Sequence, residues 1–155
     1  MLDLVRIYKA DGITYIDVND DINYPVEVFK WDPEMVGDDL GRLQGPGRFP
    51  NFKEIEAMGI EMEGKIKATT PELYWTARKA LLNIVVPDAE QTLGWHGYVG
   101  FKAADTTELY LQAVHLVHYD APLEALYPTV TPFRFEWEGL DGYWHAQSTG
   151  LPVKI

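Results

Sequence analysis

The sequence predicts an α+β fold that is mainly β: an antiparallel β-sandwich or barrel with one packed α-helix. Three stretches carry this prediction. Residues 60–68 alternate between apolar and charged side chains, which is the pattern of a half-buried strand. Residues 70–84 follow the period of an amphipathic helix. Residues 129–138 alternate again, with aromatic side chains on one face. At 155 residues we expect a single domain, 1–155, with a hydrophobic core.

The first expected element is an N-terminal β-hairpin. Residues 2–9 alternate in part, Asp11-Gly12 is a two-residue hairpin signal, and residues 13–18 are rich in β-forming side chains. The acidic residues of 17–21 lack the spacing and the closing Glu of a calcium-binding loop, so we interpret them as a polar turn. A short strand is expected over residues 26–31.

Residues 32–53 are expected to form a long irregular loop, because glycine and proline recur throughout them. Gly45-Pro46-Gly47-Arg48 is not a phosphate-binding loop, since the Gly-Lys-Ser/Thr ending is missing. Loops of this length inside compact domains are commonly functional. We therefore expect an arm that becomes ordered on a partner, with Arg42 and Arg48 as candidate contact residues.

The clearest pattern in the chain is a strand that leads into a helix, residues 59–87. One face of the strand is apolar or bare: Ile60, Met62, Gly64, Ile66 and Ala68. The other face is charged: Glu61, Glu63, Lys65 and Lys67. Thr70 is a natural N-cap with Pro71 at the first helical position, and Pro87 ends the element. We expect the apolar face of the helix to hold Leu73, Ala77, Ala80, Leu81 and Ile84, while Trp75 lies off that face.

The pattern returns to β-structure after the helix. Residues 92–102 interleave glycine with aromatic side chains and predict a hairpin or a bulged strand pair. Residues 109–119 form a long β-branched and aromatic run, and residues 129–138 alternate strongly before a turn at 139–142. Residues 150–155 are expected to be a loose tail.

Composition narrows the class of function. The net charge of −11, without any run of Lys or Arg, argues against non-specific binding of nucleic acid. The absence of cysteine excludes disulfides, thiolate metal sites and cysteine catalysis. We identify neither a secretory signal nor a long apolar run, so we expect the chain to be made and kept in a cytosol.

No catalytic motif is evident, and we expect no enzyme activity, cofactor or metal. His115 and His118 are three residues apart in an expected strand, which places them on opposite faces and argues against a zinc site. Ser148 is the only serine and lies in a turn. The carboxylate pairs Glu61/Glu63 and Glu136/Glu138 each have basic neighbours on the same face, so we interpret them as ion-paired surface rather than hydrolase chemistry.

An aromatic platform is the rival hypothesis from another class of function. Trp95, Tyr98 and Trp144 are candidates for stacking on sugar rings, which would make the chain a carbohydrate-binding β-sandwich module. Aromatic residues of this kind also occur in protein interfaces.

The order of elements resembles the N-terminal ring domain of siphophage distal tail proteins. The resemblance rests on the alternating strand Gly-Ile-Glu-Met-Glu-Gly-Lys-Ile from Gly59, the single capped helix from Thr70, and a late strand Phe-Arg-Phe-Glu-Trp-Glu (133–138) that ends near Asp141-Gly142-Tyr143-Trp144. It covers residues 2–144. The tail tube proteins and other tail rings have related folds and are the alternatives inside the phage tail.

The resemblance implies a structural role. It implies a homo-oligomeric ring, hexameric in this family, that joins the tail tube to baseplate or tip hub proteins and passes DNA as cargo. The protein would then be found in the virion tail after assembly in the host cytoplasm. The family offers no catalytic residues, and the chain is too short for the second, sugar-binding domain of many members. Candidate residues for a subunit contact or the bore are Glu61, Glu63, Lys65, Lys67, Trp75, Arg42 and Arg48.

Overall fold

The structure, a computed structural model, describes residues 2–36, 39–41, 48–50, 54–89, 95–104, 106–123 and 125–155. Its elements in chain order are β1 Leu2–Lys9, β2 Tyr15–Val18, β3 Val26–Val36, β4 Asp39–Gly41, β5 Arg48–Pro50, β6 Glu54–Lys67, α1 Pro71–Val85, β7 Gly97–Ala103, β8 Tyr110–Asp120, β9 Val130–Gly139, β10 Trp144–Ala146 and β11 Pro152–Val153. The predicted class, α+β and mainly antiparallel β with a packed helix, is confirmed.

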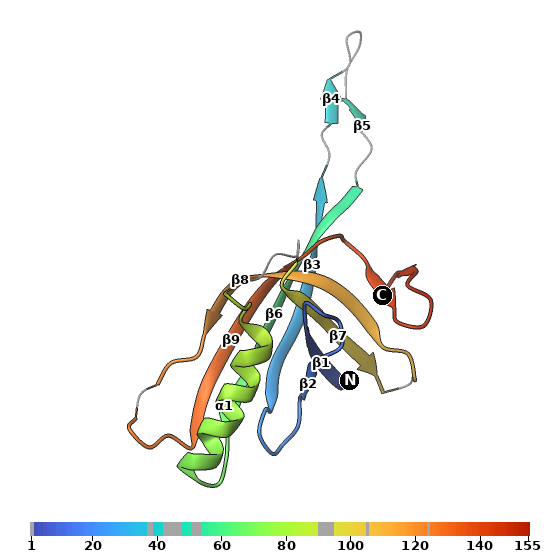
Figure 1. Cartoon of the computed structure of the whole chain (residues 1–155). Coiled ribbons are helices and arrows are strands. Elements are labelled where there is room, and N and C mark those ends of the chain that lie inside the picture. Colours follow the sequence, from blue (N-terminus) through green and yellow to red (C-terminus); the bar gives the residue numbers. More distant parts are fainter. Residues whose placement is uncertain are drawn as a thin grey trace.

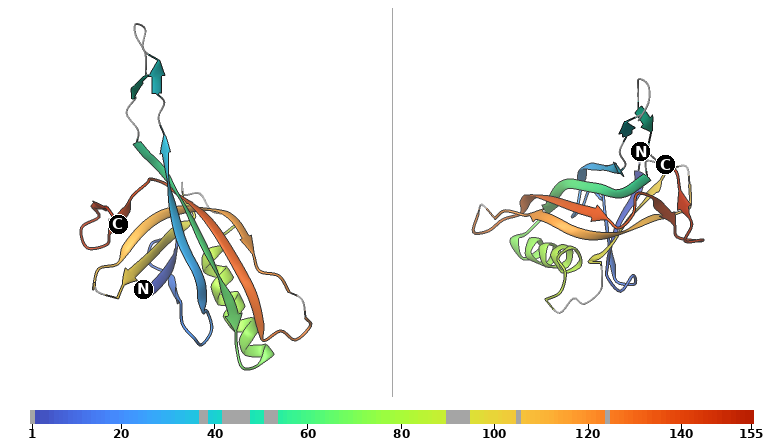
Figure 2. Two further views of the ribbon diagram at one scale, coloured as in Figure 1. Left: turned by 180° about the vertical axis from the view of Figure 1, so that it is seen from behind. Right: turned by 90° about the horizontal axis from the view of Figure 1, so that it is seen from above.

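The main antiparallel sheet is strongly curved and has the strand order β2-β1-β7-β8-β9-β6-β3, and α1 lies against its concave side (Figures 1 and 2). β10 pairs with β8 and β11, and β4 and β5 form a separate two-stranded sheet. The curvature brings distant strands together. Trp31 of β3 stacks on Phe101 of β7 with ring centroids 5.0 Å apart, although three strands (β8, β9 and β6) lie between them in the sheet. The fold is thus barrel-like, with α1 in contact with β1, β2 and β6.

The core lies between the concave face of the sheet and α1. The alternation predicted for β6 is correct, because Ile60, Met62 and Ile66 are all buried there. β9 adds a row of aromatic rings, in which Phe133 and Phe135 stack at 4.8 Å. Gly64 is required in this layer, because a Cβ there would lie 2.4 Å from the carbonyl oxygen of Pro25 and 2.8 Å from the ring of Phe133.

The helix begins as predicted, and its buried face agrees only in part with the predicted one. The side chain of Thr70 accepts a hydrogen bond from the Leu73 backbone N–H at 3.2 Å, and Pro71 is the first helical residue. Leu73, expected in the core, is 54% exposed. Tyr74 is fully buried instead, because its hydroxyl is paired with that of Thr131 at 2.6 Å and so loses no hydrogen bond inside the core.

The buried face of the helix shares Ala77, Leu81 and Ile84 with the predicted one, whereas Tyr74 and Val85 are buried in place of Leu73 and Ala80. It consists of Tyr74, Ala77, Leu81, Ile84 and Val85. Ala80, also expected in the core, is exposed.

The expectation of an irregular loop at 32–53 is wrong over much of its length. β3 continues to Val36 and pairs with β6 as far as Glu54, and β4 pairs with β5. Proline is tolerated here because β3 is an edge strand, where the missing N–H of Pro33 does not interrupt a central ladder. Arg42 lies outside the described residues, and Arg48 is the first residue of β5.

The remaining elements agree with the sequence patterns in outline. The N-terminal hairpin pairs β1 with β2, and the carboxylate of Asp11 accepts hydrogen bonds from the turn. β8 and β9 cover the strands expected at 109–119 and 129–138. Of the expected pair at 92–102, β7 is seen, and residues 90–94 lie outside the described part. The C-terminal tail, expected to be loose, contains β11 paired to β10.

β9 and β10 pair with the same edge of β8, and an irregular turn at residues 140–143 separates them. β9 leaves β8 at Gly139, and β10 rejoins it where His145 pairs with Leu111. Between these points the buried side-chain amide of Gln112 donates to the carbonyl oxygens of Asp141 and Tyr143, each at 2.8 Å. One buried side chain thus supplies the hydrogen bonds that these two backbone carbonyls would otherwise receive from a neighbouring strand.

Among the described residues, no helix has the length and apolar character that a membrane crossing requires.

Candidate functional site

The charged residues predicted on the strand of 60–68 lie on the convex face of the sheet, which we call the outer face. It is the side of the sheet away from α1 (Figure 2), and here it is formed by β3, β6, β9 and β8. Glu61, Glu63, Lys65 and Lys67 all belong to β6 and alternate with its buried residues, as predicted. The structure adds which charges of neighbouring strands they meet.

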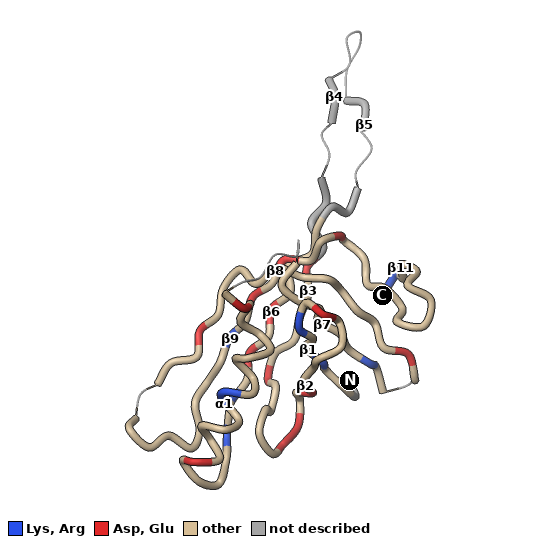
Figure 3. The backbone as a smooth tube through the Cα atoms, viewed as in Figure 1, with Lys and Arg blue, Asp and Glu red and all other residues tan. Residues whose placement is uncertain are grey.

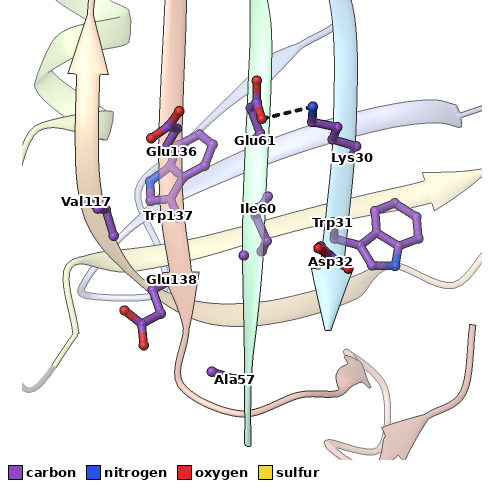
Figure 4. A pocket seen from close by; sticks show the side chains of 11 residues that line it. Lys30, Trp31, Asp32, Ala57, Ile60, Glu61, Val117, Glu136, Trp137 and Glu138 are labelled. Atoms are coloured by element: carbon purple, nitrogen blue, oxygen red, sulfur yellow. Dashed lines mark ion pairs between the residues drawn. The ribbon is translucent and has the colours of Figure 1, made fainter. Parts of the chain in front are cut away.

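Arg134 of β9 is the centre of an ion-pair network on this face. Its guanidinium lies 2.6 Å from a carboxylate oxygen of Glu136, 3.1 Å from Glu61 and 3.5 Å from Glu63. Lys30 of β3 approaches Glu61 from the other side at 3.1 Å (Figure 4). The predicted interpretation as a surface with ion pairs is confirmed for these residues.

The electrostatics keep Glu61 ionised. The hydrogen bond from Lys30, together with the charge of Arg134, lowers the pKa of Glu61 below its usual value. A general acid in glycoside hydrolysis needs a raised pKa instead. The arrangement is therefore suited to holding fixed charges rather than to donating a proton.

A groove of about 660 Å³ runs across this face beside the network (Figure 4). The strand register places Asp32, Gly59, Glu138 and His115 in one row across four strands. Gly59 has no side chain, so the row has a notch with a carboxylate on each side. The groove is lined by Lys30, Trp31, Asp32, Ala57, Gly59, Ile60, Glu61, Val117, Glu136, Trp137 and Glu138.

A β-bulge at Val117 explains the apolar part of the groove and corrects one prediction. The register of β8 shifts between Leu116 and His118, which leaves Val117 63% exposed. His115 then lies opposite Glu138 and His118 opposite Glu136, so the two histidines share a face rather than lying on opposite faces. The described residues still contain no group of three His, Cys, Asp or Glu side chains that would hold a metal.

His96, the residue before β7, packs against this part of β8. Its ring packs against that of His115 at 5.2 Å, and its Nδ1 accepts a hydrogen bond from the Leu116 backbone N–H at 2.9 Å. Burial, together with the charge of His115, lowers the pKa of His96. The neutral ring is the form that accepts this bond.

Trp75 lies off the core side of α1, as predicted. It is 36% exposed and packs edge-on against Tyr74, with ring centroids 5.7 Å apart. One turn later Lys79 is exposed, and Arg78 donates to the carbonyl oxygen of Ala121 at 2.8 Å. We call Trp75, Arg78, Lys79 and Leu82 the helix stripe; they surround a shallow hollow on the helix surface.

The predicted aromatic platform does not form. Trp144 is only 2% exposed and packs in the core against Phe101 and Trp31 at 4.8 and 5.3 Å. Trp95 and Tyr98 do lie together, at 6.2 Å, but on the other side of the sheet. The alternation along the short β10 turns Trp144 inward, a direction that a three-residue strand after an irregular turn does not reveal from sequence.

The sequence reasoning missed the partners of Tyr98. Tyr8 packs against Tyr98 at 6.5 Å and against Tyr15 at 5.4 Å. The guanidinium of Arg6 lies 3.9 Å from the Tyr15 ring and pairs with Asp17. The hairpin turn at Asp11-Gly12 was the available signal, because that turn sets Tyr8 opposite Tyr15.

An Asp-His pair near the C-terminus has a structural arrangement. His145 Nε2 lies 2.7 Å from Asp141, and its Nδ1 lies 3.1 Å from the carbonyl oxygen of Gly150. The hydroxyl of Ser148 donates to Glu108 at 2.8 Å instead of meeting the imidazole. These contacts hold the turn between β10 and β11 and do not build a serine nucleophile.

Asp141 remains ionised in this arrangement. Burial opposes its charge, but hydrogen bonds from the Tyr143 backbone and from the side chains of His145 and Gln112 outweigh that effect and lower its pKa.

The candidate site that the structure assembles is therefore the outer-face groove, with the helix stripe on the opposite side of the protein. Of the residues predicted for contacts, Glu61 lines the groove, Glu63 belongs to the adjoining network, and Trp75 lies in the stripe. Lys65 pairs with Glu27 at 2.8 Å, outside the groove. No protein-family model matches this chain, and no curated protein matches it at a significant level.

Proposed function

We propose that this protein is a structural subunit of a bacteriophage tail that assembles with its own copies into a ring. The proposal keeps the role implied by the sequence resemblance: a distal tail ring, hexameric in that family, between the tail tube and the baseplate or tip hub proteins. In this role the protein is not an enzyme and needs no cofactor. The tail tube and other tail rings are the alternative positions within the same particle.

The observation that carries the proposal is the open sheet. β3 is 11 residues long, and in the described part of the chain it pairs with β6 alone. At the other end β2 pairs with β1 alone. Exposed edges of this kind invite further pairing, and a closed ring covers them with neighbouring subunits.

The β3 edge also has features that limit uncontrolled pairing. Its register with β6 shifts twice, between Val26 and Val28 and between Glu34 and Met35. Pro33 has no N–H to donate, and Lys30 is exposed on the strand. Bulges, proline and lysine are the devices by which edge strands avoid open-ended aggregation. They favour an assembly of fixed size over a fibre.

The electrostatics support a conduit for DNA. The net charge is −11, and three carboxylates of the outer face, those of Glu61, Glu63 and Glu136, surround the single guanidinium of Arg134. An acidic surface repels the phosphate backbone, so a passing DNA molecule is not retained.

The experiment is a measurement of mass and shape. We expect sedimentation velocity and native mass spectrometry, from micromolar to several hundred micromolar protein, to show one discrete oligomer, and negative-stain microscopy to show rings. Immunogold labelling of virions then distinguishes the distal tail from the tube. A protein that stays monomeric over the whole range, and that labels no virion tail, would falsify the proposal.

A further inference from the structure

Two surfaces on opposite sides of the protein have complementary character. The outer-face groove is acidic with an apolar patch, and the helix stripe is basic with an aromatic ring. Figure 3 shows the basic residues of α1 in blue. The groove lies on the outer face, and α1 lies against the opposite face of the sheet (Figure 2), so one copy cannot bring its own stripe into its own groove.

The notch in the groove is suited to bind a single cationic group. Asp32 and Glu138 flank Gly59 in the strand register, so their Cα atoms lie about 10 Å apart across the sheet. Within the described residues neither carboxylate takes part in an ion pair, whereas Glu61 and Glu136 beside them are both neutralised. Two uncompensated negative charges thus face one side-chain-free gap.

The apolar side of the groove lies next to this notch. Val117, on the β8 bulge, is 63% exposed beside Glu138 and Glu136 (Figure 4). Because most of this valine is exposed, covering it removes apolar surface from water. The groove is therefore complementary to a surface that presents one cation and one apolar group side by side.

The helix stripe offers that pair. Trp75 and Lys79 are four residues apart on α1, so they project from the same side, with Cβ atoms about 6 Å apart. Lys79 is exposed and makes no ion pair among the described residues. No acidic residue occurs between Trp75 and Val85, so nothing on this part of the helix competes for the lysine.

We propose that the helix stripe of one copy docks into the outer-face groove of the next. Lys79 enters the notch between Asp32 and Glu138 over Gly59, and the Trp75 indole covers Val117. This inference rests on the proposed self-assembly and names its contact. The occupant is a second copy, because a single chain with a charge of −11 supplies both the basic surface and its acidic counterpart.

The contact joins two different surfaces, so it is heterologous. Such a contact repeats from copy to copy and closes into a ring when the rotation between neighbours divides a full turn. It uses side chains of α1 and of the outer face, and so it adds to the covering of the sheet edges described above.

A charge exchange tests this contact. We expect Lys79→Glu and Glu138→Lys each to weaken association by about tenfold or more, because each places like charges together. The double variant restores a lysine opposite a glutamate and should recover most of the association. Lys154→Glu is the matched control, since it makes the same charge change outside both surfaces. Dissociation constants come from sedimentation velocity on the full chain.

A second variant tests the notch itself without altering charge. A Cβ at Gly59 meets only the Asp32 carbonyl oxygen at 3.9 Å, which is ordinary contact, so Gly59→Gln leaves the fold intact while filling the notch. Loss of association in this variant, with an unchanged circular dichroism spectrum and melting temperature, supports the docking.

The failures can be told apart. An oligomer that forms equally well in all of these variants overturns the docking and leaves ring assembly standing. Single variants that weaken association without recovery in the double variant also overturn the pairing of Lys79 with Glu138. A wild-type chain that remains monomeric overturns the proposed function, and this contact with it.

Discussion

The two faces of the central strands are stabilised in different ways, although the same strands contribute side chains to both. On the concave face, β6 and β9 contribute Met62 and Phe135, which pack without any polar partner. On the convex face, one position along, Glu61 and Arg134 depend on charges from neighbouring strands. The concave face is specified by the sequence of each strand, while the convex face is specified by how the strands are registered against one another.

We expect the largest difference between the two faces in the free energy of unfolding that is lost when a side chain is truncated to alanine. Phe135→Ala is expected to lower the free energy of unfolding by about 3–5 kcal/mol, because Phe135 is fully buried and packs on Phe133 and Trp137. The matched control is its convex neighbour, Glu136→Ala, with an expected loss below about 1 kcal/mol. Urea denaturation followed by tryptophan fluorescence measures both. Similar losses in the two variants would contradict the distinction between the faces.

Polar groups on the concave side provide an intermediate case. Gln112→Leu keeps the side-chain volume similar but leaves the carbonyls of Asp141 and Tyr143 without their donor, and each such loss costs about 1–3 kcal/mol when buried. We expect a total near 3 kcal/mol in the same denaturation assay, against little change for Gln147→Leu, whose side chain is exposed. If Gln112→Leu left the free energy of unfolding unchanged, the turn at 140–143 would not need its side-chain donor.

The smallest effect is expected on the convex face. Arg134→Met should cost less than about 1 kcal/mol, and the cost should shrink further in 1 M salt, because exposed ion pairs are screened. A loss of several kcal/mol that resists salt would show that this face is structural in the same way as the core.

The contribution of the convex face to stability depends on pH, and the sign of this dependence can be stated. Since the pKa of Glu61 is lowered in the folded protein, its stabilising effect is present at neutral pH and is lost as the pH falls through that lowered value. Arg134→Met should make the loss on acidification smaller. Melting temperatures measured from pH 7 to pH 3 check this.

The sequence alone predicts the concave face well, and the reason is local. Alternation in 60–68 and 129–138 and the cap at Thr70 each depend on residues close together in the chain, so strand, helix and core residues can be read directly. The burial of Tyr74 was missed because it depends on Thr131 as hydroxyl partner, and that partner lies on β9, far from the helix in the sequence.

The candidate site could be predicted only in part, because its geometry depends on register. A single bulge at Val117 moves His118 onto the face of His115. The notch exists because Asp32 and Glu138, 106 positions apart in the numbering, both align with Gly59. Periodicity within one strand contains no information on such alignments. The same holds for Trp144, whose burial follows from the pairing of β10 with β8.

The pairing of β1 with β7 has a consequence for how the chain folds during synthesis. Leu2 lies opposite Ala103, so the N-terminal hairpin is complete long before its neighbour strand exists. At typical translation rates the ribosome needs about 5–20 s to make the intervening chain. During that interval β1 exposes a whole strand edge. The nascent hairpin is thus the segment most open to mispairing with another chain, and its native partner arrives only after the helix has been made.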